Sequence, residues 1–120
     1  MVTDEMKGKL SGTYELVVGP KQPISRKDLL RSSLTMTQDG RFSQVCVFQG
    51  GVTAAIDGTW DLIEGGIQFN SFKDCAGVWP LDLKGNNTGA SLIIEMSSPP
   101  TILLSPDVNV YYRRLPNGPP

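Results

Sequence analysis

The residues that could do acid–base or nucleophilic chemistry are few. The chain has no His, the side chain best suited to proton transfer near neutral pH and a common ligand of zinc. Asp57 and Asp61 share one face of a predicted strand, but it is the face opposite Trp60, where we expect carboxylates to meet water. The pairs Gly50-Gly51 and Gly65-Gly66 lack the spacing and the following helix of a phosphate-binding loop. We therefore predict no catalytic residue, no metal, no cofactor and no enzymatic activity.

The chain has two cysteines, Cys46 and Cys75. A disulfide between them would stabilise the fold by up to roughly 3 kcal/mol. On two strands separated by a third, their backbones would be about 9.5 Å apart, which is too far to bridge. A bond therefore requires Cys75 to lie beyond a strand end, as Asp74 and Gly77 allow. The sequence leaves open a disulfide, two free buried thiols, and metal or redox use.

Composition limits the kinds of partner. With 11 Lys and Arg against 12 Asp and Glu, the formal charge is −1. The chain therefore has no excess of positive charge that would attract nucleic acid or an anionic membrane. No apolar stretch approaches the ~20 residues of a membrane-spanning helix, so we expect a soluble protein. Residues 1–9 lack a hydrophobic signal core, which fits a cytoplasmic protein, or a periplasmic or secreted one whose signal peptide has been removed. The oligomeric state stays open.

The 13 Gly and 9 Pro among 120 residues indicate many turns within one domain, residues 1–120, with frayed ends at about 1–9 and 116–120. Alternation of apolar and polar residues predicts short strands. We expect them at 12–18, in a hairpin within 33–48, and at 56–62, 67–71, 79–83, 90–96, 101–104 and 108–115. One helix, at about 26–31, is predicted from Ser25 as N-cap and Asp28 as its capping-box partner. The predicted fold is all-β: an antiparallel meander of eight or nine strands forming a small barrel, with one short helix after the first strand.

The first hairpin has a register that its side chains can specify. A two-residue turn at Asp39-Gly40 would pair Met36 with Ser43 and place Phe42 on the wrong face. A type I turn followed by Gly40 in the left-handed bulge position pairs Met36 with Phe42 instead. Leu34, Met36, Phe42, Cys46 and Phe48 then share one face, so we predict the bulged turn. In the next hairpin, Leu62 is expected opposite Ile67, and Trp60 opposite Phe69.

One short pattern occurs twice, as GTYEL at 12–16 and GTWDL at 58–62. The glycine relieves crowding where a strand bends, and the aromatic residue two positions later points inward from the same face. Convergence of two inward-facing strands and duplication of one segment both account for it. In either case the two segments are expected to be corner strands of a curved sheet.

The first of these segments resembles the opening strand of the lipocalin-like, or calycin-like, small bacterial β-barrels. In that group a Gly-x-Trp element opens the first strand, here Gly12-Thr13-Tyr14 with Tyr in place of Trp. A short helix follows, and an Arg on the last strand packs across the aromatic ring. Arg114 matches that position, and the resemblance implies that it stacks on Tyr14 at one end of a barrel. Streptavidin-like barrels and the small barrels that inhibit bacterial metalloproteases are similar in the same general way.

Two functions fit this architecture. Inward side chains could line a pocket for a small apolar ligand, with the 26–31 helix as a lid, or could simply fill the interior. The candidate lining residues are Tyr14, Met36, Phe42, Phe48, Trp60, Phe69, Trp79, Tyr112 and Arg114. The alternative is a protein-interaction or inhibitor domain that uses its barrel-end loops and an outer sheet face. That hypothesis is based on the outward Val45 and Val47 and on an exposed, Pro-rich segment at 97–100.

Overall fold

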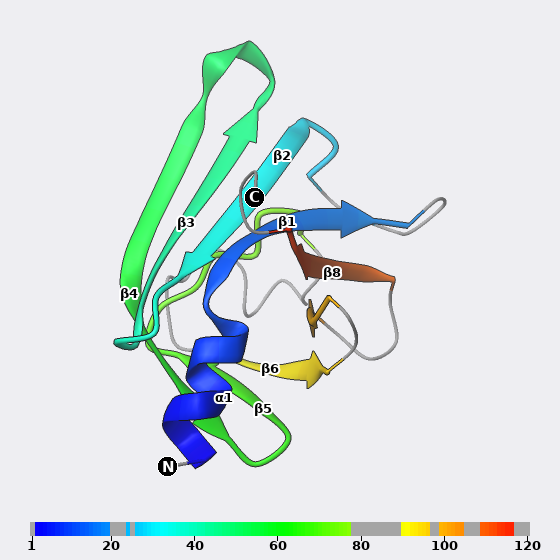
Figure 1. Ribbon diagram of the computed structural model, residues 1–120. Coiled ribbons are helices and arrows are strands. Elements are labelled where there is room, and N and C mark those ends of the chain that lie inside the picture. Colours follow the sequence, from blue (N-terminus) through cyan, green and yellow to red (C-terminus); the bar gives the residue numbers. More distant parts are fainter. Residues whose placement is uncertain are drawn as a thin grey trace.

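The strands pair in sequence order around a closed barrel in the computed structural model of this chain (Figure 1). The structure describes residues 2–19, 24, 26–77, 90–96, 99–104 and 109–116. Within them, eight antiparallel strands each pair with the next, and the last pairs with the first. The strands are β1 (Gly12–Val18), β2 (Leu29–Met36), β3 (Arg41–Phe48), β4 (Thr53–Ile63), β5 (Gly66–Phe69), β6 (Ala90–Glu95), β7 (Thr101–Leu103) and β8 (Val110–Arg114). The predicted all-β meander barrel is confirmed, and the strand expected at 79–83 lies outside the described residues.

The register predicted for the first hairpin is confirmed. Met36 pairs with Phe42, the N–H of Gly40 donates to the carbonyl of Thr37, and Gly40 has a φ of 93°. This conformation is easily reached only by glycine, so Gly40 fixes the turn and with it the face on which each β2 and β3 side chain lies. The expected pairs of Trp60 with Phe69 and of Leu62 with Ile67 also form.

The prediction of a helix at 26–31 is wrong. Residues 27 and 28 form a turn, and β2 begins at Leu29, which pairs with Phe48 on β3. The carboxylate of Asp28 does not cap a helix. It accepts two hydrogen bonds of 3.0 Å from the guanidinium of Arg26. Pairing with a neighbouring strand therefore overrides the local capping signal, as tertiary context commonly does.

The described structure has one α-helix, α1 (Val2–Leu10), which precedes the first strand, and a short 3-10 helix, η1 (Gln49–Gly51), between β3 and β4. α1 occupies the part of the chain for which the sequence predicts a frayed end. Figure 1 shows α1 lying beside the end of the barrel where β4 turns into β5. Its last residue, Leu10, is fully buried, and the carbonyl of Leu10 accepts a 2.7 Å hydrogen bond from the hydroxyl of Tyr14. No helix within the described ranges is long and apolar enough to cross a membrane.

The barrel interior holds one large apolar cluster. It includes the aromatic side chains Phe42, Phe69 and Phe72, whose neighbouring ring centroids are 4.9 and 5.1 Å apart. Phe72 also contacts Tyr112, at 6.1 Å between centroids. Three of these four rings come from strands, whereas Phe72 comes from the segment that follows β5. The interior is thus filled, in its described part, by side chains in contact.

Residues 70–77, which we call the strap, hold Phe72 in this position. Cys75 of the strap forms a disulfide with Cys46 of β3, with 6.2 Å between the Cα atoms. Because Cys75 lies beyond the end of β5, the pair meets the geometric condition stated above. The backbone N–H of Arg26 donates to the carbonyl of Ala76. The strap is therefore joined to β3 by a covalent bond and to the segment before β2 by a hydrogen bond.

Candidate functional site

The structure brings together most of the side chains predicted to line the interior. Six of them belong to the main buried cluster: Tyr14, Met36, Phe42, Trp60, Phe69 and Tyr112. Phe48 packs instead in a smaller cluster with the disulfide, where the guanidinium of Arg26 lies 4.1 Å from the centre of its ring. Trp79 lies outside the described residues. The predicted lining is therefore largely a packed core rather than the wall of an open pocket.

Arg114 lies beside Tyr14 because the two residues are paired across β1 and β8. The stacking of its guanidinium on the Tyr14 ring, which the resemblance implies, stays a prediction. The Arg114 guanidinium approaches the backbone of β1. A Cβ placed on Gly12 would lie 2.8 Å from Nε of Arg114, and Gly12 has a φ of 132°. Glycine is needed here for both its backbone conformation and its lack of a side chain. This close approach is the reason for the first glycine of the repeated pattern.

A buried polar network links β3, β8 and the strap. The side-chain amide of Gln44 donates to the Lys73 carbonyl at 2.8 Å and accepts from the Lys73 N–H at 3.0 Å. The same amide donates to the hydroxyl of Tyr112 at 2.9 Å, and Ser32 shares a 2.8 Å hydrogen bond with that hydroxyl. Burial raises the pKa of Tyr112 to about 12. The side chains of the network, Ser32, Gln44 and Tyr112, are buried and neutral, so we assign the network to holding the strap rather than to proton transfer.

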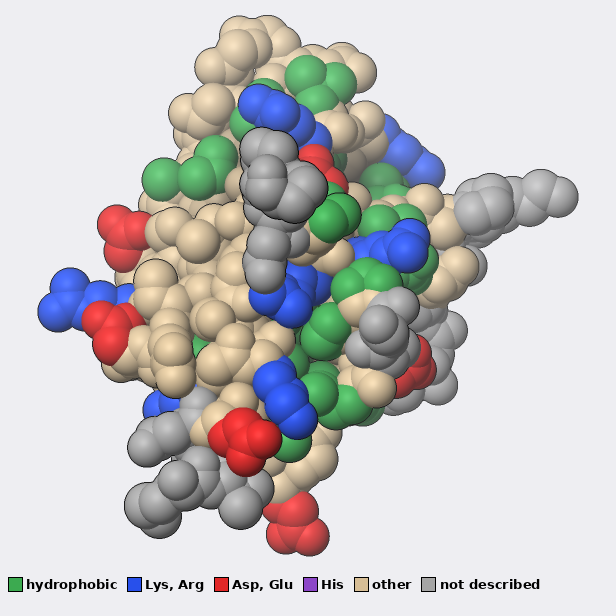
Figure 2. All heavy atoms as spheres, viewed as in Figure 1, with side chains coloured by type: hydrophobic (Ala, Val, Ile, Leu, Met, Phe, Trp, Pro, Cys, Tyr) green, Lys and Arg blue, Asp and Glu red, His purple; other side chains and the backbone are tan. Residues whose placement is uncertain are grey.

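A cleft with a mainly apolar lining lies at the end of the barrel covered by α1. We call it the barrel-end cleft. Its volume is about 430 Å³, within the range of small-molecule sites. Figure 2 shows hydrophobic side chains gathered beside α1, over the part of the barrel that carries β5 and β6. The cleft is lined by Met6, Leu62, Ile63, Glu64, Gly65, Gly66, Ile94 and Met96.

Each side of the cleft has a definite structural origin. Leu62 and Ile94 are half-buried residues packed against the main core, so the cleft continues the barrel's apolar interior to its rim. The two-residue turn Glu64-Gly65 closes the hairpin in which Ile63 pairs with Gly66. A Cβ on Gly66 would collide with the backbone of Leu92 on β6. The absence of a side chain there lets β5 and β6 approach closely beneath the cleft.

Lys7 makes a second contact that fixes the helix bordering the cleft, besides the bond between Tyr14 and Leu10. Its ammonium group is 3.1 Å from a carboxylate oxygen of Asp61 and 5.5 Å from the centre of the Trp60 ring. The backbone N–H of Leu62 and the ammonium of Lys7 both lower the pKa of Asp61. Trp60 in turn donates from Nε1 to the carbonyl of Thr37 at 2.9 Å. Asp61, considered above as half of a carboxylate pair, therefore serves to position α1.

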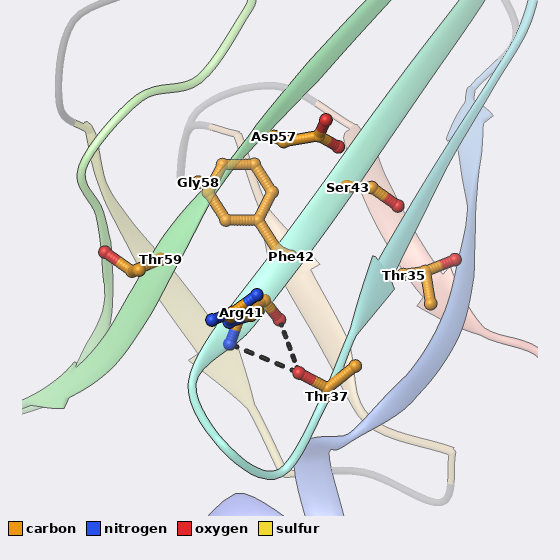
Figure 3. Close-up of a pocket in the computed structure, with 8 residues that line it drawn as sticks. All are labelled: Thr35, Thr37, Arg41, Phe42, Ser43, Asp57, Gly58 and Thr59. Atoms are coloured by element: carbon orange, nitrogen blue, oxygen red, sulfur yellow. Dashed lines mark hydrogen bonds between the residues drawn. The ribbon is translucent and has the colours of Figure 1, made fainter.

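A second hollow lies on the outer face of β2, β3 and β4, where polar and charged residues make up most of its lining, and we call it the outer-face groove. Its volume is about 540 Å³. Thr35, Ser43 and Asp57 form one row across the three strands. Figure 3 shows this row together with the ring of Phe42 beside Gly58. A Cβ on Gly58 would lie 2.8 Å from that ring, which accounts for the glycine of the second GT-aromatic pattern.

The structure shows one of the two features on which the protein-interaction hypothesis is based. Val45 is 37 % exposed on the outer face of β3. The other feature, an exposed segment at 97–100, is not supported where the structure describes it. Pro99 is half-buried and Pro100 is buried, and the carbonyl of Pro100 accepts a hydrogen bond from the N–H of Arg114. Pairing next to β7 draws this proline into the barrel wall.

Sequence reasoning missed the residues of the barrel-end cleft. The sequence predicts a frayed end around Met6, and it predicts a strand that contains Ile94 and Met96. An available signal was the apolar spacing of Met6 and Leu10, four residues apart, which marks one face of a helix. Within the described ranges, no group of three or more His, Cys, Asp or Glu side chains is placed to hold a metal ion.

No protein-family model matches this chain, and no curated protein matches it either.

Proposed function

We propose that this protein is a non-enzymatic barrel that binds a small apolar ligand in the barrel-end cleft. The observation that carries the proposal is the lining of the cleft: Met6, Leu62, Ile63, Ile94 and Met96 surround a hollow of about 430 Å³. Met96 is 52 % exposed and Ile63 is 40 % exposed. An apolar molecule seated there would remove this surface from water, at about 25 cal/mol per Å² of apolar area.

The rim is a better candidate than the deep interior. The ring of Phe69 contacts the rings of both Phe42 and Phe72, so a ligand in this part of the interior would have to displace Phe72 together with the strap. The side chains at the rim already form a hollow. Methionine adapts to ligands of different shape because its side chain is unbranched and polarizable. Met6 and Met96 therefore suit a site that accepts a flexible apolar chain.

The placement of this cleft agrees with a lipocalin-like function. The resemblance implies ligand binding within a small barrel, and we propose that α1 covers the site in place of the lid predicted at 26–31. Two contacts hold α1 beside the cleft: the hydrogen bond between Tyr14 and Leu10, and the ion pair between Lys7 and Asp61. The ligand would enter between α1 and the turn that joins β4 and β5.

A fluorescence titration tests this function. N-phenyl-1-naphthylamine, a neutral apolar probe, is added to the protein, and its emission is expected to rise and saturate. The variant Met96→Lys places a charge at the cleft and should weaken binding about tenfold or more. Val52→Lys is the matched control, because Val52 is 58 % exposed on the β3–β4 connection, away from the cleft. Equal binding by both variants, or no saturable binding by the wild type, would contradict the proposal.

A second candidate function is binding of another protein at the outer-face groove. It is favoured by the exposed Val45 and by the hollow beside it, which has hydroxyl groups at Thr35 and Ser43 and opposite charges at Arg41 and Asp57. Proteins captured from the native extract by wild type, by Val45→Asp and by Val52→Asp should be compared quantitatively. A partner that uses this face is lost only with Val45→Asp. Identical profiles for all three would remove this candidate.

A further inference from the structure

Among the described residues, the lining of the barrel-end cleft includes one charged group. Seven of the eight described lining residues are apolar or glycine, and the eighth is Glu64. Glu64 occupies the first position of the two-residue turn between β4 and β5, and it is exposed. The backbone of this turn is fixed by the Ile63–Gly66 pair, and Gly65 has a φ of 78°. The backbone that carries the exposed Glu64 is therefore fixed at the rim, whereas Met6, Leu62 and Ile94 of the same lining are half-buried.

The basic side chains of α1 are engaged elsewhere. Lys7 lies 3.1 Å from Asp61 and against the ring of Trp60. Lys9 lies 3.9 Å from Glu5, one helical turn earlier on the same face. Each lysine thus has its own carboxylate within the described part of the chain, so neither balances Glu64. Among the described residues, Glu64 is thus the one charged side chain in the lining of the cleft, although the formal charge of the whole protein is only −1. A single carboxylate in an otherwise apolar lining favours a cation over an anion.

We propose that the ligand of the barrel-end cleft is an amphiphile with a positively charged head group and an apolar tail. This inference rests on the proposed function and specifies its ligand class. The tail packs among Leu62, Ile94 and Met96, and the head group lies at the rim beside the Glu64 carboxylate. A fatty acid of the same tail length would bring its own carboxylate against Glu64. Glu64 is therefore the residue that determines specificity.

Three probes with one tail length test the head group. Dodecyltrimethylammonium, 1-dodecanol and dodecanoate each compete with N-phenyl-1-naphthylamine, below their micelle or solubility limits. We expect the cation to bind about tenfold more tightly than the carboxylate, with the alcohol between them. An exposed pair of charges changes a binding constant by roughly a few-fold, and attraction of one head group adds to repulsion of the other. The preference should shrink with added salt.

The variant Glu64→Gln is expected to bring the affinities for the cation and the carboxylate to within about two-fold of each other. Asp57→Asn is the matched control: it removes one negative charge on the outer face of β4, and it should keep the wild-type preference. Equal or tighter binding of dodecanoate by the wild type would overturn this inference while leaving the apolar site intact. Failure of all three probes to compete would instead count against the proposed function. A preference that survives in Glu64→Gln would overturn the role of Glu64.

Discussion

The hydroxyl of Tyr14 donates a 2.7 Å hydrogen bond to the backbone carbonyl of Leu10. Leu10 is the last residue of α1, and Tyr14 is the buried aromatic residue of β1. Carbonyl groups at the end of a helix have no partner within the helix. This bond satisfies one of them inside the barrel and anchors the helix that borders the barrel-end cleft.

The variant Tyr14→Phe should loosen α1. It removes the donor and leaves the buried carbonyl of Leu10 without this hydrogen bond, which costs about 1–2 kcal/mol of the free energy of unfolding. Urea unfolding measures the loss of stability. Relative to the wild type, the variant should lose more protection from hydrogen exchange in α1 than in β3. Tyr111→Phe, on β8, is the control and should change neither. Unchanged exchange in α1 would contradict the anchoring role of Tyr14.

Stability should fall between about pH 10 and pH 12. Burial raises the pKa of Tyr14 to about 12, the nearby Arg114 guanidinium offsetting part of the effect, and burial likewise raises the pKa of Tyr112 to about 12. In this range an unfolded tyrosine loses its proton while the folded one keeps it, so the unfolded state binds fewer protons. Each group then lowers the free energy of unfolding by up to roughly 1.4 kcal/mol per pH unit.

Urea unfolding measured at half-unit steps of pH checks this dependence. The fall of the free energy of unfolding with pH should be less steep in Tyr14→Phe and in Tyr112→Phe than in the wild type, because each variant removes one titrating group. Tyr111→Phe again serves as the control. A slope that stays the same in both core variants would show that other groups cause the alkaline loss.

The variant Gln44→Ala should release the strap. It removes two hydrogen bonds with the backbone of Lys73, one with the hydroxyl of Tyr112, and a longer one of 3.7 Å to Sγ of Cys75. Because Gln44 and Tyr112 are buried and the Lys73 backbone is partly buried, we expect a loss of about 2–4 kcal/mol of the free energy of unfolding. Hydrogen exchange at the Lys73 amide should accelerate more than at amides of β2. Glu15→Ala on β1 is a control for substitution on a strand. If hydrogen exchange in Gln44→Ala accelerated equally at all amides, a local role for Gln44 would be contradicted.

Reductant should not reach the Cys46–Cys75 disulfide in the folded protein. Cys46 is 0 % exposed and Cys75 is 2 % exposed. Thiol titration after mild reductant should therefore detect two thiols only when denaturant is also present. The double variant Cys46→Ser, Cys75→Ser should lose about 2–4 kcal/mol of stability. Free thiols in the folded protein without reductant would contradict the bond.

Local patterns in the sequence determined the barrel wall. Alternation placed Met36, Phe42, Trp60 and Phe69 on the inner face, because neighbouring residues in a strand point to opposite sides. Gly40 fixed the first hairpin, since the left-handed conformation that the bulged turn requires is one that glycine adopts readily. Both signals act within a few residues, so they need no knowledge of distant contacts.

Tertiary structure decided the parts that border the candidate site. The capping signal at Asp28 predicted a helix, but pairing of Leu29 with Phe48 drew that segment into β2. Phe72 and Cys75 lie in a segment without alternation, and they are placed by contacts with residues far away in the chain. The barrel-end cleft likewise combines Met6, Leu62 and Met96 from three distant segments. Periodicity shows which face of an element is buried, whereas only the packing of elements determines where a hollow remains.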